Sequence, residues 1–506
     1  MEVLYFPGCI CRLVTGRDGE DIDRRVWSSD VHTSQEGVEE RRGSIEGEQV
    51  LADKFYLFMG LSGRRTGDRG ESAIENGGIW GQSDRGSEKG VGERRGGHER
   101  GRTGERRTWF SPSSMSANRH QHQVNSQTKV LDTIHGRILC IADIRGRLAA
   151  LNDLAREAHA HAIIHTGDFG FFGAHASLRV FCVANLFLES NSLDRINDRT
   201  LRHITMYSPL IPSAQRSHLL SQDNPPSLIR STVNIALLSE FPLLLSGQIK
   251  LQVPVYTVWG ACEDVLVLEK FRSKAYAIEN LHVIDEATTR VLDVGGVKLR
   301  LLGLGGALVP HKMFDNGDGN ATIAGAQGTM WTTALQIGEL VDTAQRVFDP
   351  TETRLLVTHA SPGREGIIAQ LALLLKADLT ISAGLHFRYA TSYNEFSVQG
   401  DFGGFRHKLT VGKESFDRVW DSVKVQVEAV VDDHQRILLE KALSVVERIP
   451  SSQPSTGPGA TATGEEPAWK NCWNWNLCDA AYGSLVLDIK EGRISAELKS
   501  QGSSYF

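Results

Sequence analysis

Short apolar runs recur along the chain from residue 129 onward, and several of them end directly at a charged or polar residue. The first two runs, at 138–142 and 162–165, flank a stretch at 148–158 whose apolar residues have helical spacing. This order predicts a strand, a helix and a second, parallel strand. Further strand-like runs follow at residues 253–259, 291–294, 297–304, 354–359 and 379–383.

Two pairs of runs have the pattern of hairpins. Gly295-Gly296 joins the runs at 291–294 and 297–304 with the chemistry of a two-residue turn. Apolar runs at 485–489 and 494–498, around Glu491-Gly492, predict a second hairpin at the end of the chain. Because helices alternate with the early strands and hairpins follow later, we expect an α/β fold with mixed sheets.

The first 128 residues have a different composition, rich in Arg, Gly and Glu. Residues 61–110 contain 13 Gly, 10 Arg and 8 Asp or Glu, with few periodic apolar positions. Such a stretch buries too little apolar surface to offset its ordering entropy, so residues 1–128 are expected to be disordered. An RNA-binding tail is a weaker alternative, because acidic residues interleave with the arginines. Another alternative is that translation begins at Met115 and that the preceding region is not natural protein.

The foldable part is expected to be one domain over residues 129–506. Residues 191–250, with many Ser, Asn and Pro, predict an irregular insertion with some helix. Apolar spacing over 413–448 predicts a helical extension of one or two amphipathic helices. The Pro/Ser/Thr/Gly-rich stretch at 451–466 predicts a linker before the terminal hairpin.

Composition narrows the class of protein. In 506 residues, 55 Lys and Arg against 61 Asp and Glu give a formal net charge of -6, so no positive excess favours nucleic acid or an anionic membrane surface. No apolar stretch reaches the roughly 18 residues of a membrane span. The seven cysteines are scattered without Cys-x-x-Cys spacing, which argues against a disulfide framework. We expect a reducing compartment, the cytoplasm, with the nucleus as the alternative.

Polar residues follow five of the predicted strands at the point where each strand ends. In α/β sheets, ligands bind outside the carboxyl ends of the strands, so the convergence of five such ends predicts a functional site. The residues at these ends are Asp143, Asp168, Glu263 with Asp264, His359 and His386.

The order of these residues, Asp, Gly-Asp, Gly-x-x-Glu, Thr-His and Gly-x-His, resembles the motif order of calcineurin-like metallophosphoesterases. The runs VWGACED, AQGTMWTT, THASPGREG and SAGLHFRY narrow the resemblance to a fungal branch that carries the domain called DUF2433. The resemblance covers roughly residues 130–506. It implies the calcineurin-like phosphoesterase fold, in which two mixed β-sheets pack face to face and are flanked by helices.

In that superfamily two metal ions share a bridging aspartate, generate hydroxide from water and clamp the phosphate, while a histidine protonates the leaving group. The positions of this chain that match the family motifs are Asp143, Gly167, Asp168, Gly260, Glu263 and His359.

Other positions depart from the family pattern. Arg145 stands where the first-motif histidine would be, and Phe171 or its neighbour replaces the second acid. Ala261 and Cys262 replace an Asn-His pair, so the usual general acid is missing. His386 keeps one histidine of the last motif, out of register by one residue.

These departures imply a reduced metal site. A guanidinium is permanently charged, so Arg145 is expected to replace the first metal by ion pairs with Asp143 and Asp168. At most one divalent metal, Zn, Mn or Fe, is then expected. The ligands of such a metal would be Asp168, His359, His386 and Cys262.

Two hypotheses about function follow. The first is a phosphate-ester hydrolase with a mononuclear metal. The second is a catalytically inactive pseudo-phosphoesterase without metal, which binds a phosphorylated small molecule or phosphoprotein, or serves as a protein-interaction module. No membrane partner is expected, and the sequence does not support a nucleic-acid partner.

The resemblance also assigns roles to individual residues under these hypotheses. Arginine clusters bind phosphate without a metal, which makes three arginines near the strand ends candidates for ligand binding. These arginines are Arg145, Arg364 and Arg388. The expected catalytic residues are Asp143, Arg145, Glu263 and Asp264.

Overall fold

The computed structural model describes residues 2–6, 9–16, 125–132, 134–173, 191–317, 322–385, 391–393, 402–449 and 472–501. Contacts divide the chain into two units, Met1–Val26 with Arg107–Phe506 and Trp27–Arg106, and every described residue belongs to the first. Most of the region 1–128, which we expected to be disordered, lies outside the described residues, as does the predicted linker at 451–466. The described parts of that region form β1 (Glu2–Phe6), β2 (Cys9–Gly16) and the start of β3 (Asn125–Asp132).

One large sheet has eight strands. In spatial order they are β1, β2, β17 (Arg493–Gln501), β16 (Gly483–Lys490), β4 (His135–Ala142), β5 (Ala162–Thr166), β6 (Val255–Thr257) and β7 (Leu281–Val283). β4, β5, β6 and β7 run parallel, as the predicted strand-helix-strand unit requires. β16 and β17 form the predicted terminal hairpin, and β16 joins β4 antiparallel.

The other large sheet has seven strands. In spatial order they are β14 (Thr391–Tyr393), β15 (Trp473–Cys478), β13 (Leu379–Leu385), β12 (Thr353–Thr358), β9 (Val297–Leu304), β8 (Thr288–Val294) and β3. β9, β12, β13 and β15 run parallel, and β8 joins β9 as the other predicted hairpin. Gly295 and Gly296 of its turn have φ of 56° and 82°, which suits a two-residue turn that non-glycine residues adopt with strain. A small third sheet pairs β10 (Gly325–Ala326) with β11 (Thr329–Met330).

The two large sheets pack face to face around a shared apolar core. Ile138 and Ile164 of the eight-stranded sheet and Leu299, Leu355 and Ile381 of the seven-stranded sheet are all fully buried in it. Burying a side chain of this kind contributes about 1.5–3 kcal/mol. The expected α/β class with two mixed, packed sheets is therefore confirmed.

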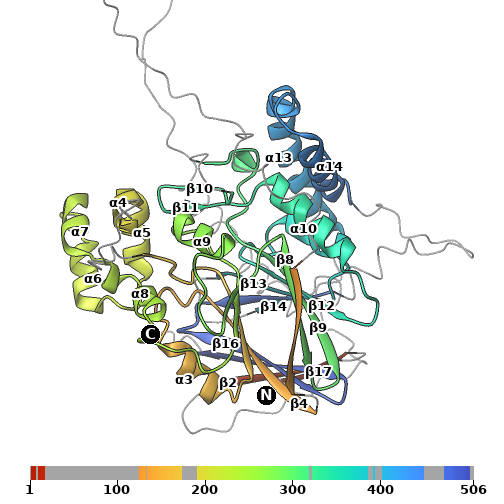
Figure 1. The fold of residues 1–506 in the computed structure, drawn as a ribbon, viewed down its shortest axis with the longest axis horizontal. Coiled ribbons are helices and arrows are strands. Elements are labelled where there is room, and N and C mark those ends of the chain that lie inside the picture. Colours follow the sequence, from red (N-terminus) through yellow and green to blue (C-terminus); the bar gives the residue numbers. More distant parts are fainter. Residues whose placement is uncertain are drawn as a thin grey trace, which may run out of the picture. The chain divides into compact units, whose positions relative to one another are not determined.

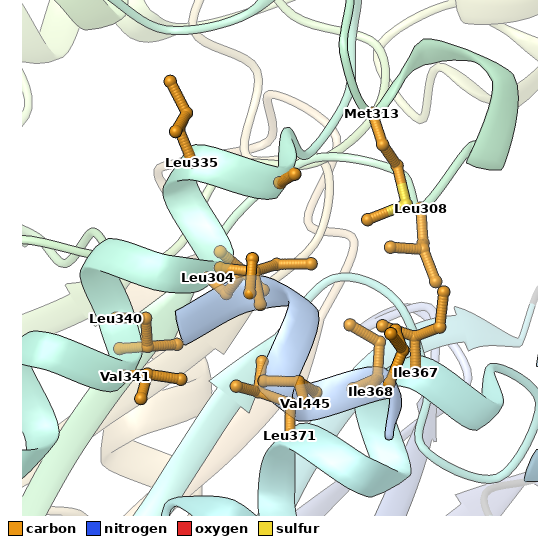
Figure 2. Close-up of a cluster of buried hydrophobic side chains, with 14 of the residues drawn as sticks. Leu304, Leu308, Met313, Leu335, Leu340, Val341, Ile367, Ile368, Leu371 and Val445 are labelled. Carbon is orange, nitrogen blue, oxygen red and sulfur yellow. The ribbon is translucent and has the colours of Figure 1, made fainter. Parts of the chain in front are cut away.

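Helices cover the outer faces of both sheets (Figure 1). α3 (Ala150–Glu157) and α9 (Val265–Arg272) pack on the eight-stranded sheet. The seven-stranded sheet carries α10 (Ala334–Arg346), α11 (Gly366–Leu374), α13 (Phe402–Glu428) and α14 (Asp433–Val446). Figure 2 shows part of the apolar core between the seven-stranded sheet and these helices, in which Leu304 of β9 lies near Leu371 and Val445. No helix among the described residues is long and apolar enough to cross a membrane.

The predicted helical extension at 413–448 consists of two helices, and it begins earlier than predicted, at Phe402. Phe405 and Leu409 are buried and continue the apolar spacing towards the N-terminus, which explains the longer helix. A capping box of Asp432 and Gln435 starts the second helix.

The insertion at 191–250 is more regular than its composition predicted. It contains α4 (Ser192–Arg195), α5 (Asp198–Tyr207), α6 (Ser213–Leu219), α7 (Pro226–Thr232), the 3-10 turn η2 (Ile235–Leu237) and α8 (Phe241–Leu245). A second 3-10 turn, η3 (Pro310–Lys312), follows β9. The asparagines that predicted irregularity cap these helices instead: Asn191 accepts from Leu193 N–H and Asn197 accepts from Thr200 N–H.

Gly338 lies where α10 packs against α14. A Cβ at this position would lie 1.9 Å from the carbonyl oxygen of Leu438, so Gly338→Ala must push the two helices apart. We expect the free energy of unfolding to fall by about 1–3 kcal/mol, the usual cost of overpacking, in urea denaturation.

Gly412→Ala on α13 is the matched control. The nearest atoms to a Cβ there are 3.5 Å away, an ordinary contact. Its stability should stay unchanged or rise by up to about 1 kcal/mol, because alanine favours the helix. Equal losses in both variants would contradict a close α10–α14 contact at Gly338.

Candidate functional site

The carboxyl ends of β4, β5, β6, β12 and β15 lie together at what we call the strand-tip face. The Thr166 hydroxyl at the end of β5 donates to Thr358 O at the end of β12 at 2.5 Å, which joins the two sheets there. Asp143 N–H donates to Thr166 O at 3.0 Å, and Ala480 N–H donates to Ala142 O at 2.6 Å. The residues that follow β4, β5 and β12 are therefore brought together, as the sequence predicted, whereas the end of β15 at this face was not predicted.

Arg145 lies at the centre of the strand-tip face. Its Nε donates to Asp479 Oδ2 at 2.9 Å, and its Nη1 donates to Asp168 Oδ2 at 3.1 Å. Its Nη2 lies 3.5 Å from Asp143 Oδ2. The ion pairs expected with Asp143 and Asp168 are present, and Asp479 adds a third. We call these four buried residues the Arg145 cluster.

The cluster keeps Arg145 charged, and two of its members have an unusual backbone conformation. Burial opposes the charge of Arg145, but Asp143, Asp479 and Asp168 outweigh it and raise the pKa of the guanidinium. The Tyr207 ring, from α5, lies over the guanidinium with 4.9 Å between its centroid and the guanidinium carbon. Asp143 and Arg145 have φ of 50° and 49°, a left-handed conformation that costs energy for residues with side chains.

Asp168 uses both of its carboxylate oxygens. Oδ2 accepts from Arg145, and Oδ1 accepts from Ala261 N–H at 2.9 Å and Cys262 N–H at 3.1 Å. Gly260 makes this approach feasible, because a Cβ there would lie 2.0 Å from Asp168 Oδ1. The loop after β6 thus wraps around a carboxylate whose charge is balanced within the protein.

Glu263, which we expected to be catalytic, holds a loop in the structure. Its Oε1 accepts from Phe169 N–H and Gly170 N–H, both at 2.7 Å, and its Oε2 accepts from Gly260 N–H at 3.0 Å. Burial, and then Asp168, raise the pKa of Glu263 to about 8 against the opposing effect of these donors. The residue is fully buried.

Asp264 and Cys262 also make contacts that stabilise the fold. Asp264 caps α9 by accepting from Leu266 N–H at 3.1 Å, and it forms an ion pair with Arg195 of the insertion. Cys262 is buried against the core of the insertion. Burial, with Asp168 nearby, holds the pKa of its thiol well above the usual value. A thiol in this state does not ionise readily to the thiolate that binds zinc.

His359 follows β12 and is buried at the strand-tip face. Its backbone links both neighbouring strands, since His359 N–H donates to Leu304 O and Ala383 N–H donates to His359 O, each at 3.3 Å. Arg364 is half-buried in the turn before α11. The predicted residues His386 and Arg388 lie outside the described residues.

Sequence reasoning missed two residues of this site. Asp479 directly follows the apolar and aromatic run of β15, the same strand-then-acid pattern that drew attention to Asp143 and Asp168. His165 is the fourth residue of β5 and is fully buried. Its Nε2 accepts from Ile144 N–H at 3.3 Å, so Nδ1 carries the proton and donates to Thr257 Oγ1 at 2.8 Å.

In the described part of the chain, the side chains of the Arg145 cluster are not arranged to bind a metal ion. Among the described residues, no group of three or more His, Cys, Asp or Glu side chains is arranged to hold a metal ion. The carboxylates that would be ligands, Asp143 and Asp168, instead surround a guanidinium. A divalent ion beside Arg145 would be repelled by a permanent positive charge.

Comparison with known proteins adds one finding. Residues 389–506 match a family model described as a protein of unknown function, DUF2433. This match supports the DUF2433 part of the resemblance found in the sequence. The DUF2433 segment includes α13, α14 and the β15–β17 strands, and it supplies Asp479 to the Arg145 cluster. No curated protein matches the chain.

His165 predicts a loss of stability in acid. Burial lowers the pKa of His165 to about 3, with smaller opposing effects from Asp143 and Asp168, whereas an unfolded chain has a histidine pKa of about 6.5. Between these values the unfolded state binds more protons than the folded state. The contribution of His165 to the free energy of unfolding should therefore fall as the pH drops, by up to about 1.4 kcal/mol per pH unit.

Urea denaturation from pH 7 to pH 4 measures this dependence. His165→Gln serves as the comparison, because glutamine keeps polar atoms at the position but does not titrate. Its pH profile should be flatter than that of the natural protein between pH 6.5 and 4. Parallel profiles would contradict a neutral, buried His165.

Proposed function

We propose that this chain is a non-hydrolytic relative of calcineurin-like phosphoesterases that acts by binding a protein partner. The observation that carries the proposal is the contact of the Arg145 guanidinium with Asp143, Asp168 and Asp479. In the superfamily that the sequence resembles, acidic residues at these strand ends hold metal ions. Here a side chain supplies the positive charge instead.

The paired sheets support the resemblance to that superfamily. Two mixed sheets pack face to face, and acidic residues follow β4 and β5 at the same face as the histidine after β12. These positions correspond to Asp143, Asp168 and His359, which match the family motifs. The calcineurin-like fold is part of the proposal on this basis.

Electrostatics disfavours phosphate at the Arg145 cluster. Three carboxylates surround one guanidinium, so an incoming phosphate group would meet more negative than positive charge. Two of the guanidinium nitrogens already donate to Asp168 and Asp479. This balance favours the protein-interaction form of the pseudo-phosphoesterase hypothesis over binding of a phosphorylated ligand at this centre.

The insertion also lies over the strand-tip face. Tyr207 covers Arg145, Arg195 pairs with Asp264, and the Ser239 hydroxyl donates to Gly170 O at 2.5 Å. Hydrolysis needs a substrate and a water molecule next to the ligands of the metal. Contacts that bury those positions support a structural role for the cluster.

Replacing Arg145 tests whether it stands in for a metal. Arg145→His restores the residue type of the family motif and leaves Asp143, Asp168 and Asp479 without their cation. We expect Mn²⁺ or Zn²⁺ to raise the melting temperature of this variant, because a metal at about 100 times its Kd contributes about 2.7 kcal/mol to stability. The natural protein should show no such gain.

Arg145→Met is the matched control, since it removes the charge without adding a nitrogen ligand. Its gain with metal should be smaller than that of Arg145→His. A natural protein stabilised by metal as strongly as Arg145→His would contradict the proposal and support the mononuclear hydrolase hypothesis. Hydrolysis of p-nitrophenyl phosphate, measured in parallel with and without chelator, would then be expected.

A further inference from the structure

A large cleft lies apart from the Arg145 cluster. Its volume is about 1230 Å³, and it is lined by the strands β3 and β7 and by residues of α9, α10 and α14. Pockets for small ligands have volumes of about 300–1,000 Å³, so this cleft has room for a larger occupant. No residue of the Arg145 cluster lines it.

β7 presents unpaired backbone to this cleft. Ile284 N–H donates to Thr257 O and Asn280 O accepts from Val255 N–H, so these alternate residues direct their backbone groups towards β6. The backbone groups of successive strand residues point to opposite edges, so those of Val283 point away from β6. Within the described ranges, no strand pairs with that edge of β7.

The outer strand of the other sheet lines the same cleft. β3 is the edge strand of the seven-stranded sheet, and its residues Ser126 and Gln127 belong to the lining. Both side chains are exposed. Open strand edges are templates for pairing with another chain. Here edge strands of both large sheets line the same cleft.

Charge and apolar surface in the cleft suit a polypeptide. Charged side chains of both signs line it: the basic ones are Arg272, Lys274, Arg290 and Arg346, and the acidic ones are Asp285, Glu339 and Asp342. Two pairs of them, Arg272 with Asp285 and Arg346 with Asp342, form ion pairs within the protein. A compact anion would meet the three carboxylates, and a bare cation would meet the four basic groups. A polypeptide that carries side chains of both signs is complementary to this mixed lining.

Aromatic side chains complete the lining. Phe271 and Tyr276 are half-buried beside β7, where alternate side chains of an added strand would contact them. Strand addition combines these two sources of recognition: main-chain hydrogen bonds give affinity, and contacts to every second side chain give specificity.

We infer that this cleft binds an extended peptide segment of a partner protein, which adds as a strand to β7. The inference rests on the proposed binding role and names its site and the class of its partner. It is tested through Val283 and Lys274, which do not touch the Arg145 cluster, so its failure is distinguishable from a failure of the proposed function.

The experiment selects peptides from a displayed library of random 12-residue sequences on the full chain and measures their affinity by fluorescence anisotropy. Val283→Pro removes the outward N–H without removing a bond to β6, which proline permits at an edge strand. We expect binding to weaken by about tenfold, the effect of losing one main-chain hydrogen bond. Val283→Ala keeps the N–H and should weaken binding by less than about threefold.

Lys274→Glu provides a second variant should proline at 283 lower the melting temperature. Lys274 is exposed, so its replacement leaves the core unchanged. Selected peptides should lose affinity for this variant, and a peptide with its acidic residue changed to lysine should regain it.

Three results would overturn the inference. One is a library that yields no enriched peptide. Another is binding that neither Val283→Pro nor Lys274→Glu alters. The third is a dimer of the natural protein that Val283→Pro dissociates, because the edge of β7 would then belong to a second copy of this chain.

Discussion

The ion pairs between Arg145 and three carboxylates tie together the strand ends of both sheets. Asp143 and Asp168 follow strands of the eight-stranded sheet, whereas Asp479 follows a strand of the seven-stranded one. Removing one partner of a buried ion pair costs about 3–5 kcal/mol, because the other charge stays buried without compensation. The site and the closure of the sandwich at this face therefore depend on the same four side chains.

This dependence reaches across the whole sequence. The chain passes from β15 in one sheet to β16 in the other, and Asp479 lies at that crossing. β16 then pairs with β4, which leads directly to Asp143 and Arg145. The DUF2433 segment is thus an integral part of the sandwich. Separating it would remove Asp479 from Arg145 and leave β4 with one unpaired edge.

Local signals in the sequence predicted much of this architecture. Apolar runs predicted the strands, and Gly295-Gly296 predicted a hairpin. Acidic residues directly after strands identified Asp143 and Asp168 as site residues. The contact of Arg145 with both was predicted because a guanidinium replaced a histidine. Asp479 was missed because its pairing spans more than 300 residues of sequence. The insertion was predicted to be irregular because asparagine is common in loops. In the structure its asparagines cap helices, and the sequence alone does not show which backbone N–H groups they accept from.

Metal content per chain tests the central claim most directly. Elemental mass spectrometry on the full chain, purified without chelator, would be compared with the same measurement on His359→Ala. We predict that both proteins contain less than about one tenth of a metal ion per chain, because the guanidinium of Arg145 already contacts the carboxylates that would bind a metal. About one metal per chain in the natural protein, lost in His359→Ala, would contradict the account and assign a mononuclear site to the strand-tip face.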